Sequence, residues 1–408
     1  MRLLEINSVS NKGSTGRIAE GIGRLAISNE WNCVVAYGRD SNPGSVTSFQ
    51  IGGPNSVACH VALTRLLDMH GLGSFVSTMR FLRWVDKFHP DIIHLHNIHG
   101  YYLNYPLLFK YICSRNIPVV WTLHDCWSFT GHCCYFDSVR CEKWKTGCHG
   151  RCPLIQSYPK SFIINRAACS YRLKKRNFIL PEKMCIVPVS FWLDRFLGDS
   201  FLSCKEHRVI HNGIPLDIFK NSILKNPETL SSSDLLRKTD GKPIVLGVAS
   251  TWDERKGLTD FVKLNDLTND YQIVLVGLSK KQIEGLPGGI IGIERTENQT
   301  QLAHLYQAAT VFFNPTYSDN YPTTNLEASA CGTPVVTYRT GGSPESVYEQ
   351  NGYVVEQGDL KSALDAFNKV HKRGKQYWSS RCRAVAEQHF NEEKCFMSYL
   401  KLYDELLE

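Results

Sequence analysis

Short apolar runs alternate with amphipathic stretches through the first half of the chain. We expect a buried strand at each apolar run, namely Leu3–Val9, Cys33–Tyr37, Ile92–His96, Val119–Leu123 and Ile186–Val189. Between the first two runs, Ile18, Ile22 and Leu25 recur at the spacing of one helix face. Runs of Val, Ile and Leu without polar alternation are typical of strands covered on both faces, as in a parallel sheet.

The second half of the chain repeats this alternation. The expected strands are Ile244–Ala249, Gln272–Val276, Ile290–Ile293, Val311–Asn314 and Val335–Tyr338. The expected helices are Gly257–Leu267, Gln301–Ala308, Thr324–Ala330, Leu360–His371 and Asn391–Leu407. Two successive βαβ series predict an α/β protein with two doubly wound, Rossmann-like domains that face each other across a cleft.

Turn-forming residues interrupt the alternation near the middle of the chain, and we predict a linker over residues 218–242. The N-terminal domain then covers residues 1–217 and the C-terminal domain residues 243–388. The last segment, 389–408, is expected to be a helix that is free to pack back on the N-terminal domain.

Composition narrows the class of protein. Apolar residues make up 43 % and charged residues 21 % of the 408 residues, which excludes a largely disordered chain. The 46 Lys and Arg residues against 39 Asp and Glu give a net charge of +7, which suits an anionic ligand or a membrane surface and does not point to nucleic acid. The apolar runs are too short to cross a bilayer and Glu5 interrupts the first, so we expect a cytoplasmic protein without a secretory signal.

Three segments that follow predicted strands carry candidate chemistry. Gly13, Ser14, Thr15 and Gly16 open the first helix, where backbone amides either cradle an anion or form a plain tight turn. Residues 253–257 contain two adjacent cations before a glycine, which is typical of a pyrophosphate clamp or of a solvated charge pair.

The third segment, 314–336, contains two acids separated by seven residues, Asp319 and Glu327. Pro322, followed by Thr323 and Thr324, predicts that a helix starts between the two acids. A helix start aims N–H groups at an anion, while a carboxylate beside it can accept two sugar hydroxyls.

This third segment resembles the signature of retaining glycosyltransferases of the GT-B fold, in particular the polysaccharide-biosynthesis branch of glycosyltransferase family 4 (group 1). Asp319 and Glu327 occupy the two acid positions of that signature, and Leu326–Val336 matches its tail. Further segments that resemble the family follow in the same order along the chain: 13–16, 122–125, 211–215 with Phe219, 256–257 and 341–345.

The resemblance implies a role for each matching residue. Those implied at the catalytic centre are His124, Arg255, Lys256 and Asp319. Those implied to bind the donor are Gly13, Ser14, Thr15, Gly16, Thr323, Thr324, Asn325, Glu327, Gly341 and Gly342. In detail, Glu327 would hold the hydroxyls of the nucleotide ribose. Lys256 with Arg255 would neutralise the charge of the diphosphate leaving group, and His124 would form a hydrogen bond to the donor sugar.

Two departures from the family pattern concern the same site. The first acid is Asp319, which is one methylene shorter than the usual Glu. Residues 247–250 stand where the family has a Gly-Arg pair, so Arg255 is our candidate for the missing diphosphate-binding arginine. No Asp-x-Asp metal motif is apparent in the donor half, and the resemblance implies catalysis that requires no cofactor.

The resemblance therefore predicts a hexosyltransferase that uses a UDP- or GDP-sugar. Its acceptor would be a growing, polyprenyl-linked glycan in capsule, exopolysaccharide or O-antigen synthesis. Two alternatives stay open, namely a nucleotide-sugar epimerase or hydrolase of the same fold, and a non-catalytic nucleotide-sugar-binding scaffold.

Cysteine and histidine clusters lie in the N-terminal half. Cys133, Cys141, Cys148 and Cys152 lie in an insertion, about residues 126–153, where a structural zinc, packed free thiols and disulfides are all open alternatives. The residues expected to contact the acceptor are His94 and His96, which alternate on one strand, and Asn97, which follows it. Metal binding is the alternative for the two histidines.

A basic stretch follows the insertion at Arg172, Lys174, Lys175 and Arg176, next to the apolar residues 162–164. It is either a solvated basic helix or a peripheral contact with the anionic inner face of the cytoplasmic membrane.

Overall fold

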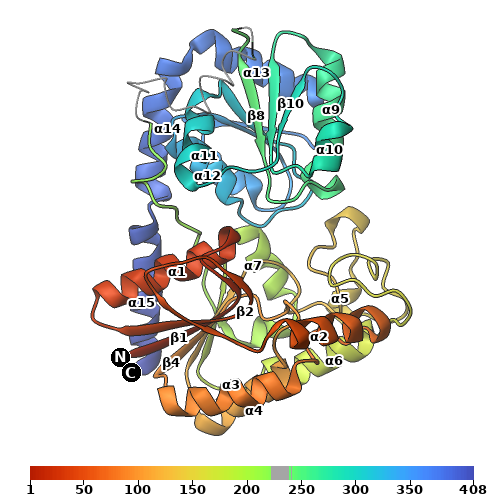
Figure 1. The fold of residues 1–408 in the computed structure, drawn as a ribbon, viewed down its shortest axis with the longest axis vertical. Coiled ribbons are helices and arrows are strands. Elements are labelled where there is room, and N and C mark those ends of the chain that lie inside the picture. Colours follow the sequence, from red (N-terminus) through yellow and green to blue (C-terminus); the bar gives the residue numbers. More distant parts are fainter. Residues whose placement is uncertain (222–238, 240) are drawn as a thin grey trace. The chain divides into compact units, whose positions relative to one another are not determined.

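Each half of the chain forms its own parallel sheet, which confirms the predicted α/β class. The computed structural model describes residues 1–221, 239 and 241–408. Unit 1 consists of Met1–His211 together with Phe396–Glu408, and unit 2 consists of Asn212–Cys395 (Figure 1). Most of the linker that we predict over residues 218–242 lies outside the described residues.

Unit 1 is built on a seven-stranded sheet of order β3-β2-β1-β4-β5-β6-β7. Its strands are β1 (Arg2–Ser10), β2 (Asn32–Ser41), β3 (Thr47–Gln50), β4 (Ile92–Leu95), β5 (Val119–Leu123), β6 (Met184–Pro188) and β7 (Glu206–His207). Its helices are α1 (Gly13–Ser28), α2 (Pro54–Leu67), α3 (Phe75–Phe88), α4 (Tyr105–Arg115), α5 (Lys143–Thr146), α6 (Ala167–Phe178) and α7 (Phe191–Gly198). Short 3₁₀ turns are η1 (Asp137–Val139) and η2 (Phe201–Cys204).

The central strands of unit 1 are confirmed because their apolar runs are buried on both faces; every residue of β4, β5 and β6 is buried. The edge strands β3 and β7 were not predicted from the sequence, and there is a physical reason for this. The sequence of β3 is polar and mostly exposed, and β7 has two residues, so neither carries an apolar run.

The C-terminal helix α15 (Glu392–Leu407) contributes its residues from Phe396 on to unit 1. The Tyr399 hydroxyl accepts a hydrogen bond from Thr122 of β5 at 3.1 Å, and the Tyr403 hydroxyl lies 2.6 Å from Nδ1 of His94 in β4. Hydrogen bonds between buried side chains therefore tie the end of the chain to the centre of this sheet.

Unit 2 is built on a six-stranded sheet of order β10-β9-β8-β11-β12-β13. Its strands are β8 (Ile244–Val248), β9 (Gln272–Val276), β10 (Ile290–Ile293), β11 (Val311–Asn314), β12 (Val335–Tyr338) and β13 (Gly352–Val355). Its helices are α9 (Leu258–Leu267), α10 (Lys280–Glu284), α11 (Gln299–Ala308), α12 (Thr323–Ala330), α13 (Leu360–Arg373) and α14 (Lys375–His389), with 3₁₀ turns η3 (Glu254–Lys256) and η4 (Ser343–Ser346).

All five strands predicted for the second half are confirmed, and β13, α10 and α14 are additions. The strand β13 starts at Gly352, where a Cβ atom would lie 1.9 Å from the Val335 carbonyl oxygen. A glycine is needed there because the neighbouring backbone approaches so closely, and that glycine shortens the apolar run that would reveal the strand.

The insertion between β5 and α6 has an aromatic core of its own. Trp144 stacks on Phe136 with ring centroids 5.2 Å apart and contacts Phe129 edge-on at 5.4 Å. Both Trp144 and Phe136 also contact Phe196 of α7. Aromatic packing therefore fixes the insertion to the rest of unit 1.

The helix α6 departs from a solvated basic helix at one of its four basic positions. Arg172, Lys175 and Arg176 are exposed, but Lys174 is buried. Its ammonium donates to the Trp127 carbonyl at 2.6 Å and to the Thr130 carbonyl at 3.0 Å, and it lies 3.5 Å from the centre of the Trp127 ring. Lys174 is therefore a link between α6 and the insertion.

No helix among the described residues combines the length and the apolar character needed to span a bilayer.

The burial of Lys174 predicts a pH-dependent stability. Burial lowers the pKa of Lys174 to about 7, whereas a lysine in an unfolded chain has a pKa of about 10.4. Between these values the unfolded chain binds more protons than the folded one, so the free energy of unfolding rises with pH. Between about pH 7 and about pH 9, the free energy of unfolding of the wild type should rise by up to about 1.4 kcal/mol per pH unit relative to that of Lys174→Met. The measurement is urea unfolding at a series of pH values.

The exposed neighbour Lys175→Met is the matched control, and its difference from the wild type should not change with pH. A wild-type advantage over Lys174→Met that stays constant across this range would contradict the buried position of the ammonium.

Candidate active site

The sheet of unit 2 has a topological switch point between β8 and β11. From β8 the chain builds β9 and β10 on one side, and β11, β12 and β13 lie on the other side. The connections that leave the carboxyl ends of β8 and β11 diverge there, which opens a crevice where ligands bind in folds of this kind. The predicted cations follow β8 and the predicted first acid follows β11.

Backbone hydrogen bonds join the two loops at this point. The Arg255 carbonyl accepts from the Tyr317 amide at 2.7 Å, and the Arg255 guanidinium donates to the Ser318 carbonyl, also at 2.7 Å. In addition, a Cβ atom at Gly257 would lie 2.3 Å from the Pro315 carbonyl oxygen. Gly257 has a φ of +75°, so this position needs a glycine both for its conformation and for the close contact.

Lys256 and Asp319 form an ion pair across the two loops, between Nζ and Oδ2. Their side chains are 20 % and 14 % exposed, so both are largely shielded from water. Burial alone would raise the pKa of the Asp319 carboxyl, but the charges of Lys256 and Arg255 hold that pKa below its ordinary value. The carboxylate is therefore ionised at neutral pH and holds the ammonium at the switch point.

The loop after β12 completes this arrangement. The Gly342 amide donates to the Asp319 carbonyl at 3.0 Å. A Cβ atom at Gly341, whose φ is +57°, would lie 2.0 Å from that same oxygen. The two glycines thus let the third loop pack against the Asp319 backbone.

The helix α12 starts directly after the loop that carries Asp319, with Thr323 and Thr324 in its first turn. Glu327 lies one turn further and is buried, and its Oε2 accepts from the Tyr306 hydroxyl at 3.0 Å. The structure therefore brings Lys256, Asp319 and the start of α12 to neighbouring loops of one sheet edge.

Asn325 is placed differently from the expected donor contact. Its side chain has no exposed surface, accepts from the Asn314 amide at 2.8 Å and donates to the Ser343 and Ser346 hydroxyls at 3.0 and 2.9 Å. These bonds use the amide inside unit 2, so Asn325 ties α12 to β11 and η4.

The sheet of unit 1 has a corresponding switch point between β1 and β4. The predicted loop Gly13–Gly16 lies at the carboxyl end of β1 and forms the first turn of α1. The Asn7 side chain donates to the Thr15 hydroxyl at 3.4 Å and accepts from the Asn97 amide at 3.3 Å. Asn7 thus joins the glycine-rich turn to the segment after β4.

A row of polar side chains crosses the centre of this sheet. Nε2 of His96 lies 3.0 Å from Oε2 of Glu5, and Nδ1 of His96 lies 3.1 Å from Nε2 of His124. Burial raises the pKa of Glu5 and lowers those of His96 and His124, the latter to about 4. His124 is therefore a neutral imidazole at physiological pH.

His94 has no exposed surface, and both of its ring nitrogens are already used. Nδ1 contacts the Tyr403 hydroxyl at 2.6 Å and Nε2 contacts the Thr122 hydroxyl at 2.7 Å. Both nitrogens of His96 are likewise engaged, by Glu5 and His124. His94 therefore belongs to the core of unit 1, which corrects the expectation that it contacts an acceptor. His96 is buried in the same row but also lines a small pocket.

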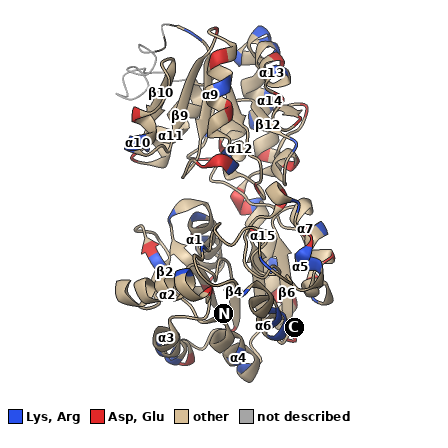
Figure 2. Ribbon diagram, turned by 90° about the vertical axis from the view of Figure 1, so that its right-hand side faces the viewer, with Lys and Arg blue, Asp and Glu red and all other residues tan. Residues whose placement is uncertain are grey.

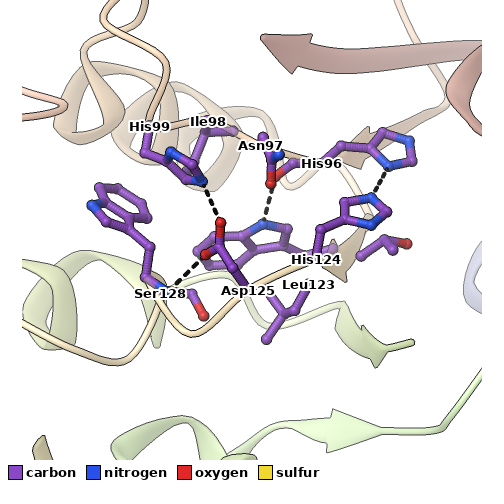
Figure 3. Close-up of a pocket in the computed structure, with 11 residues that line it drawn as sticks. His96, Asn97, Ile98, His99, Leu123, His124, Asp125 and Ser128 are labelled. Carbon is purple, nitrogen blue, oxygen red and sulfur yellow. Dashed lines mark hydrogen bonds and ion pairs between the residues drawn. The ribbon is translucent and has the colours of Figure 1, made fainter. Parts of the chain in front are cut away.

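A small pocket lies between the segments that follow β4 and β5, and its lining includes Asn97 and His124 (Figure 3). His99 points towards Asp125 across this pocket, with Nε2 and Oδ2 3.0 Å apart (Figure 3). Burial opposes the ionisation of Asp125, but His99 and the Trp127 amide lower its pKa. The pocket therefore offers a carboxylate that is largely shielded from water, with a side chain that is 13 % exposed.

The four cysteines of the predicted zinc site do not form a complete ligand set. The Cys133 thiol donates to Cys152 and thereby lowers the pKa of Cys152, while the Gly131 amide donates to the Cys148 sulfur at 3.1 Å. Among the described residues, metal-ligating atoms come within 4.8 Å of one another in three other groups: Glu5 with His94 and His96, Asp68 with His70 and His132, and His99 with Asp125 and Cys134. None of these three groups contains a cysteine of the predicted zinc site, so the arrangement does not show a structural zinc.

Glu5 and Tyr403 are polar residues of these sites that the sequence did not reveal. Asp125 lies in the segment 122–125 that resembles the family, but the resemblance gave it no role of its own. A signal for Glu5 exists in the pairing of neighbouring strands, because Glu5 and His94 are register partners in β1 and β4. Polar residues at alternate positions of central strands, such as His94 and His96, share one face and predict such a row.

Comparison with known proteins agrees with this geometry. Residues 33–218 match the family described as Glycosyltransferase Family 4, and residues 234–386 match Glycosyl transferases group 1. The putative colanic acid biosynthesis glycosyl transferase WcaC of Escherichia coli (strain K12) is 27 % identical over 315 residues, which cover 74 % of this chain and 72 % of that protein.

Two solved structures share the fold over nearly the whole chain. Sucrose-phosphate synthase from Thermosynechococcus elongatus has a TM-score of 0.72 at 18 % identity and covers 99 % of this chain and 98 % of its own. Anabaena HepE in complex with UDP-glucose has a TM-score of 0.64 at 14 % identity; the match covers 99 % of this chain and 100 % of the HepE chain. Since the two family matches together span both units, the chain belongs to the group 1 glycosyltransferases of family 4, enzymes of the GT-B fold that use nucleotide-sugar donors.

Proposed function

We propose that this chain transfers a hexose from a nucleotide-diphosphate sugar to a growing glycan with retention of the anomeric configuration. The observation that carries the proposal is the ion pair of Lys256 and Asp319 at the switch point of unit 2, with Glu327 on the adjacent helix. This set offers cations for a diphosphate and acids for hydroxyl groups.

The chemistry assigned to these residues follows from the charges that develop. Breaking the bond between sugar and phosphate leaves negative charge on the diphosphate and positive charge on the anomeric carbon. Lys256, Arg255 and the amides of the first turn of α12, at Thr323 and Thr324, would stabilise the leaving group. The loop of Gly341 and Gly342 would approach the same group without side chains in the way.

The remaining roles are assigned to the sugar and to the ribose. Glu327 would accept the ribose hydroxyls, and Asp319 would contact a hydroxyl of the transferred hexose. The neutral imidazole of His124 in unit 1 would donate a hydrogen bond to that hexose or accept one from it. The backbone amides of Gly13–Gly16 would face the phosphates. A departing phosphate oxygen can take the acceptor proton on the same face, so no protein base is assigned.

The likeness to WcaC supports exopolysaccharide synthesis as the setting, because that relative carries a colanic acid assignment. Capsule and O-antigen assembly use acceptors of the same chemistry. A polyprenyl-linked acceptor would place the enzyme at the cytoplasmic face of a membrane. The UDP-glucose complex of HepE supports a uridine nucleotide ahead of a guanosine nucleotide as the donor.

Nucleotide-dependent stabilisation is the first test of this proposal. UDP or GDP at about 100 times its dissociation constant should raise the free energy of unfolding by about 2.7 kcal/mol. Glu327→Gln should weaken this nucleotide about tenfold or more, because it removes hydrogen bonds to a charged group. The readout is the thermal unfolding midpoint as a function of nucleotide concentration.

The exposed acid Glu294→Gln in the same unit is the control and should bind as the wild type does. A folded wild type that neither nucleotide stabilises would contradict the transferase and favour the scaffold alternative. Donor turnover that is indifferent to every glycan acceptor would favour a hydrolase or epimerase.

Lys256→Met tests the leaving-group role. Loss of a preorganised cation at the developing diphosphate charge should lower kcat by ~10²–10³ and change KM much less. The measurement is steady-state release of the nucleoside diphosphate, with the exposed Lys280→Met as the control. A kcat for Lys256→Met within a few-fold of the wild type would exclude this role.

The neutrality of His124 predicts the shape of the pH profile. Because the pKa of His124 is about 4, its ring stays neutral above about pH 5 and adds no limb to the profile of kcat/KM between pH 5 and pH 8. His124→Asn should therefore lower the whole profile without displacing it. An apparent pKa in this range that disappears in the variant would contradict the assignment.

A further inference from the structure

The positive charge of the chain is concentrated in one segment of unit 1. Residues 138–181 contain a single acid, Glu142, and ten basic residues: Arg140, Lys143, Lys145, Arg151, Lys160, Arg166, Arg172, Lys174, Lys175 and Arg176. The segment alone therefore exceeds the net charge of +7 of the whole chain. All ten basic residues except Lys174 are exposed, and Figure 2 shows basic positions on α5 and α6.

Three consecutive apolar side chains protrude from the middle of this segment. Phe162 is 54 % exposed, Ile163 73 % and Ile164 38 %. The backbone beneath them is held in place, because the Phe162 amide donates to the Arg65 carbonyl of α2 at 2.8 Å and the Ser161 hydroxyl donates to the Ile164 carbonyl, also at 2.8 Å. The apolar tip is therefore a built feature of the surface.

The helix α2 carries further exposed apolar side chains next to residues 162–164. After its first turn, the exposed positions of this helix are apolar except for one charge, Arg65. The apolar ones are Ala58, Cys59, Ala62, Leu63, Leu66 and Leu67. Leu66 is 49 % exposed. A helix of this length covers about 20 Å of surface.

The other end of α2 meets a third group of exposed apolar residues. The Ser77 hydroxyl of α3 donates to the Ser56 hydroxyl of α2 at 2.9 Å, which places the first turn of α3 beside the start of α2. Phe75 and Val76 in that turn are 54 % and 59 % exposed. We call α2, the first turn of α3 and residues 158–166 the apolar surface.

Acidic side chains are absent from the exposed part of this surface. Within residues 41–85, all of which the structure describes, the one acid is Asp68, and it has no exposed surface. Its Oδ2 accepts from the Arg166 amide at 2.7 Å, so this acid is used to fix the tip to α2. Cations border the tip instead, with Lys160 and Arg65 within 5.0 and 6.0 Å of the Phe162 ring.

We propose that the apolar surface docks unit 1 onto a lipid bilayer with anionic headgroups. Apolar side chains that protrude from a firm backbone can enter the headgroup region, while the surrounding Lys and Arg side chains remain at the level of the lipid phosphates. Each cation near such a surface contributes about 1 kcal/mol of attraction. The charge complementarity, with exposed bases and no exposed acid, favours an anionic bilayer over a neutral one.

The test is co-sedimentation of the full chain with phosphatidylcholine vesicles that either contain or lack phosphatidylglycerol. The wild type should bind the anionic vesicles, bind the neutral ones far more weakly, and dissociate as salt is raised. Ile163→Asp should weaken binding about tenfold or more, because it removes an inserted side chain. Lys160→Gln and Arg166→Gln should each weaken it about fivefold.

Matched controls come from exposed positions of unit 2. Leu267→Asp, at a residue that is 50 % exposed, and Lys280→Gln should bind vesicles as the wild type does. Ile163→Asp should keep the wild-type response to nucleotides, so a failure of this proposal is distinguishable from a failure of the proposed transferase.

Two results would overturn the proposal. One is a folded wild type that does not bind anionic vesicles at low salt, or that binds them no better than Ile163→Asp does. The other is a dimer in sedimentation velocity that Ile163→Asp dissociates without any vesicle, which would assign the apolar surface to a second copy of this chain.

Discussion

The ion pair between Lys256 and Asp319 joins two loops that the sheet topology would otherwise send apart. The strands β8 and β11 are paired neighbours, but the chain leads from β8 to one side of the sheet and from β11 to the other, so the connections at their carboxyl ends diverge. The pair and the bonds of Arg255 to residues 317 and 318 close that gap. A cation fixed in advance beside a helix start needs little reorganisation when charge develops on a leaving group.

The centre of unit 1 is organised by a different principle. Polar side chains on β1, β4 and β5 bond one another inside the sheet, and tyrosines of α15 supply partners for His94 and Thr122. Buried polar groups are tolerated because they are hydrogen-bonded, and a satisfied network is rigid. His124 stands at the end of this row and lines the small pocket, so the network fixes the orientation of its ring.

The fold was predictable wherever burial leaves a simple trace in the sequence. Central strands such as Val119–Leu123 have the predicted bounds, because a strand covered on both faces must be apolar throughout. The edge strand β3 is polar, and β13 begins at a glycine that close backbone contact requires, so neither leaves that trace. The loops with Lys256, Asp319 and Gly341 were found through motif resemblance, and their mutual contacts confirm that they share one sheet edge.

The side-chain partners were less predictable than the elements, because each depends on residues distant in the sequence. His94 reads as a ligand at the end of a strand, yet its partner Tyr403 lies 309 positions away. Lys174 reads as part of a solvated basic helix, yet the insertion supplies two carbonyls that bury it. Asn325 lies in the signature helix, but its three partners belong to β11 and η4 and use its amide within the unit.

A crystal structure of this chain with UDP bound would test directly whether the Lys256–Asp319 pair lies at the nucleotide site. We expect diphosphate oxygens within hydrogen-bond distance of Lys256 Nζ and the Arg255 guanidinium, with the ribose hydroxyls on the Glu327 carboxylate. A nucleotide bound away from the carboxyl ends of β8 and β11, with the Lys256–Asp319 pair untouched, would contradict this expectation.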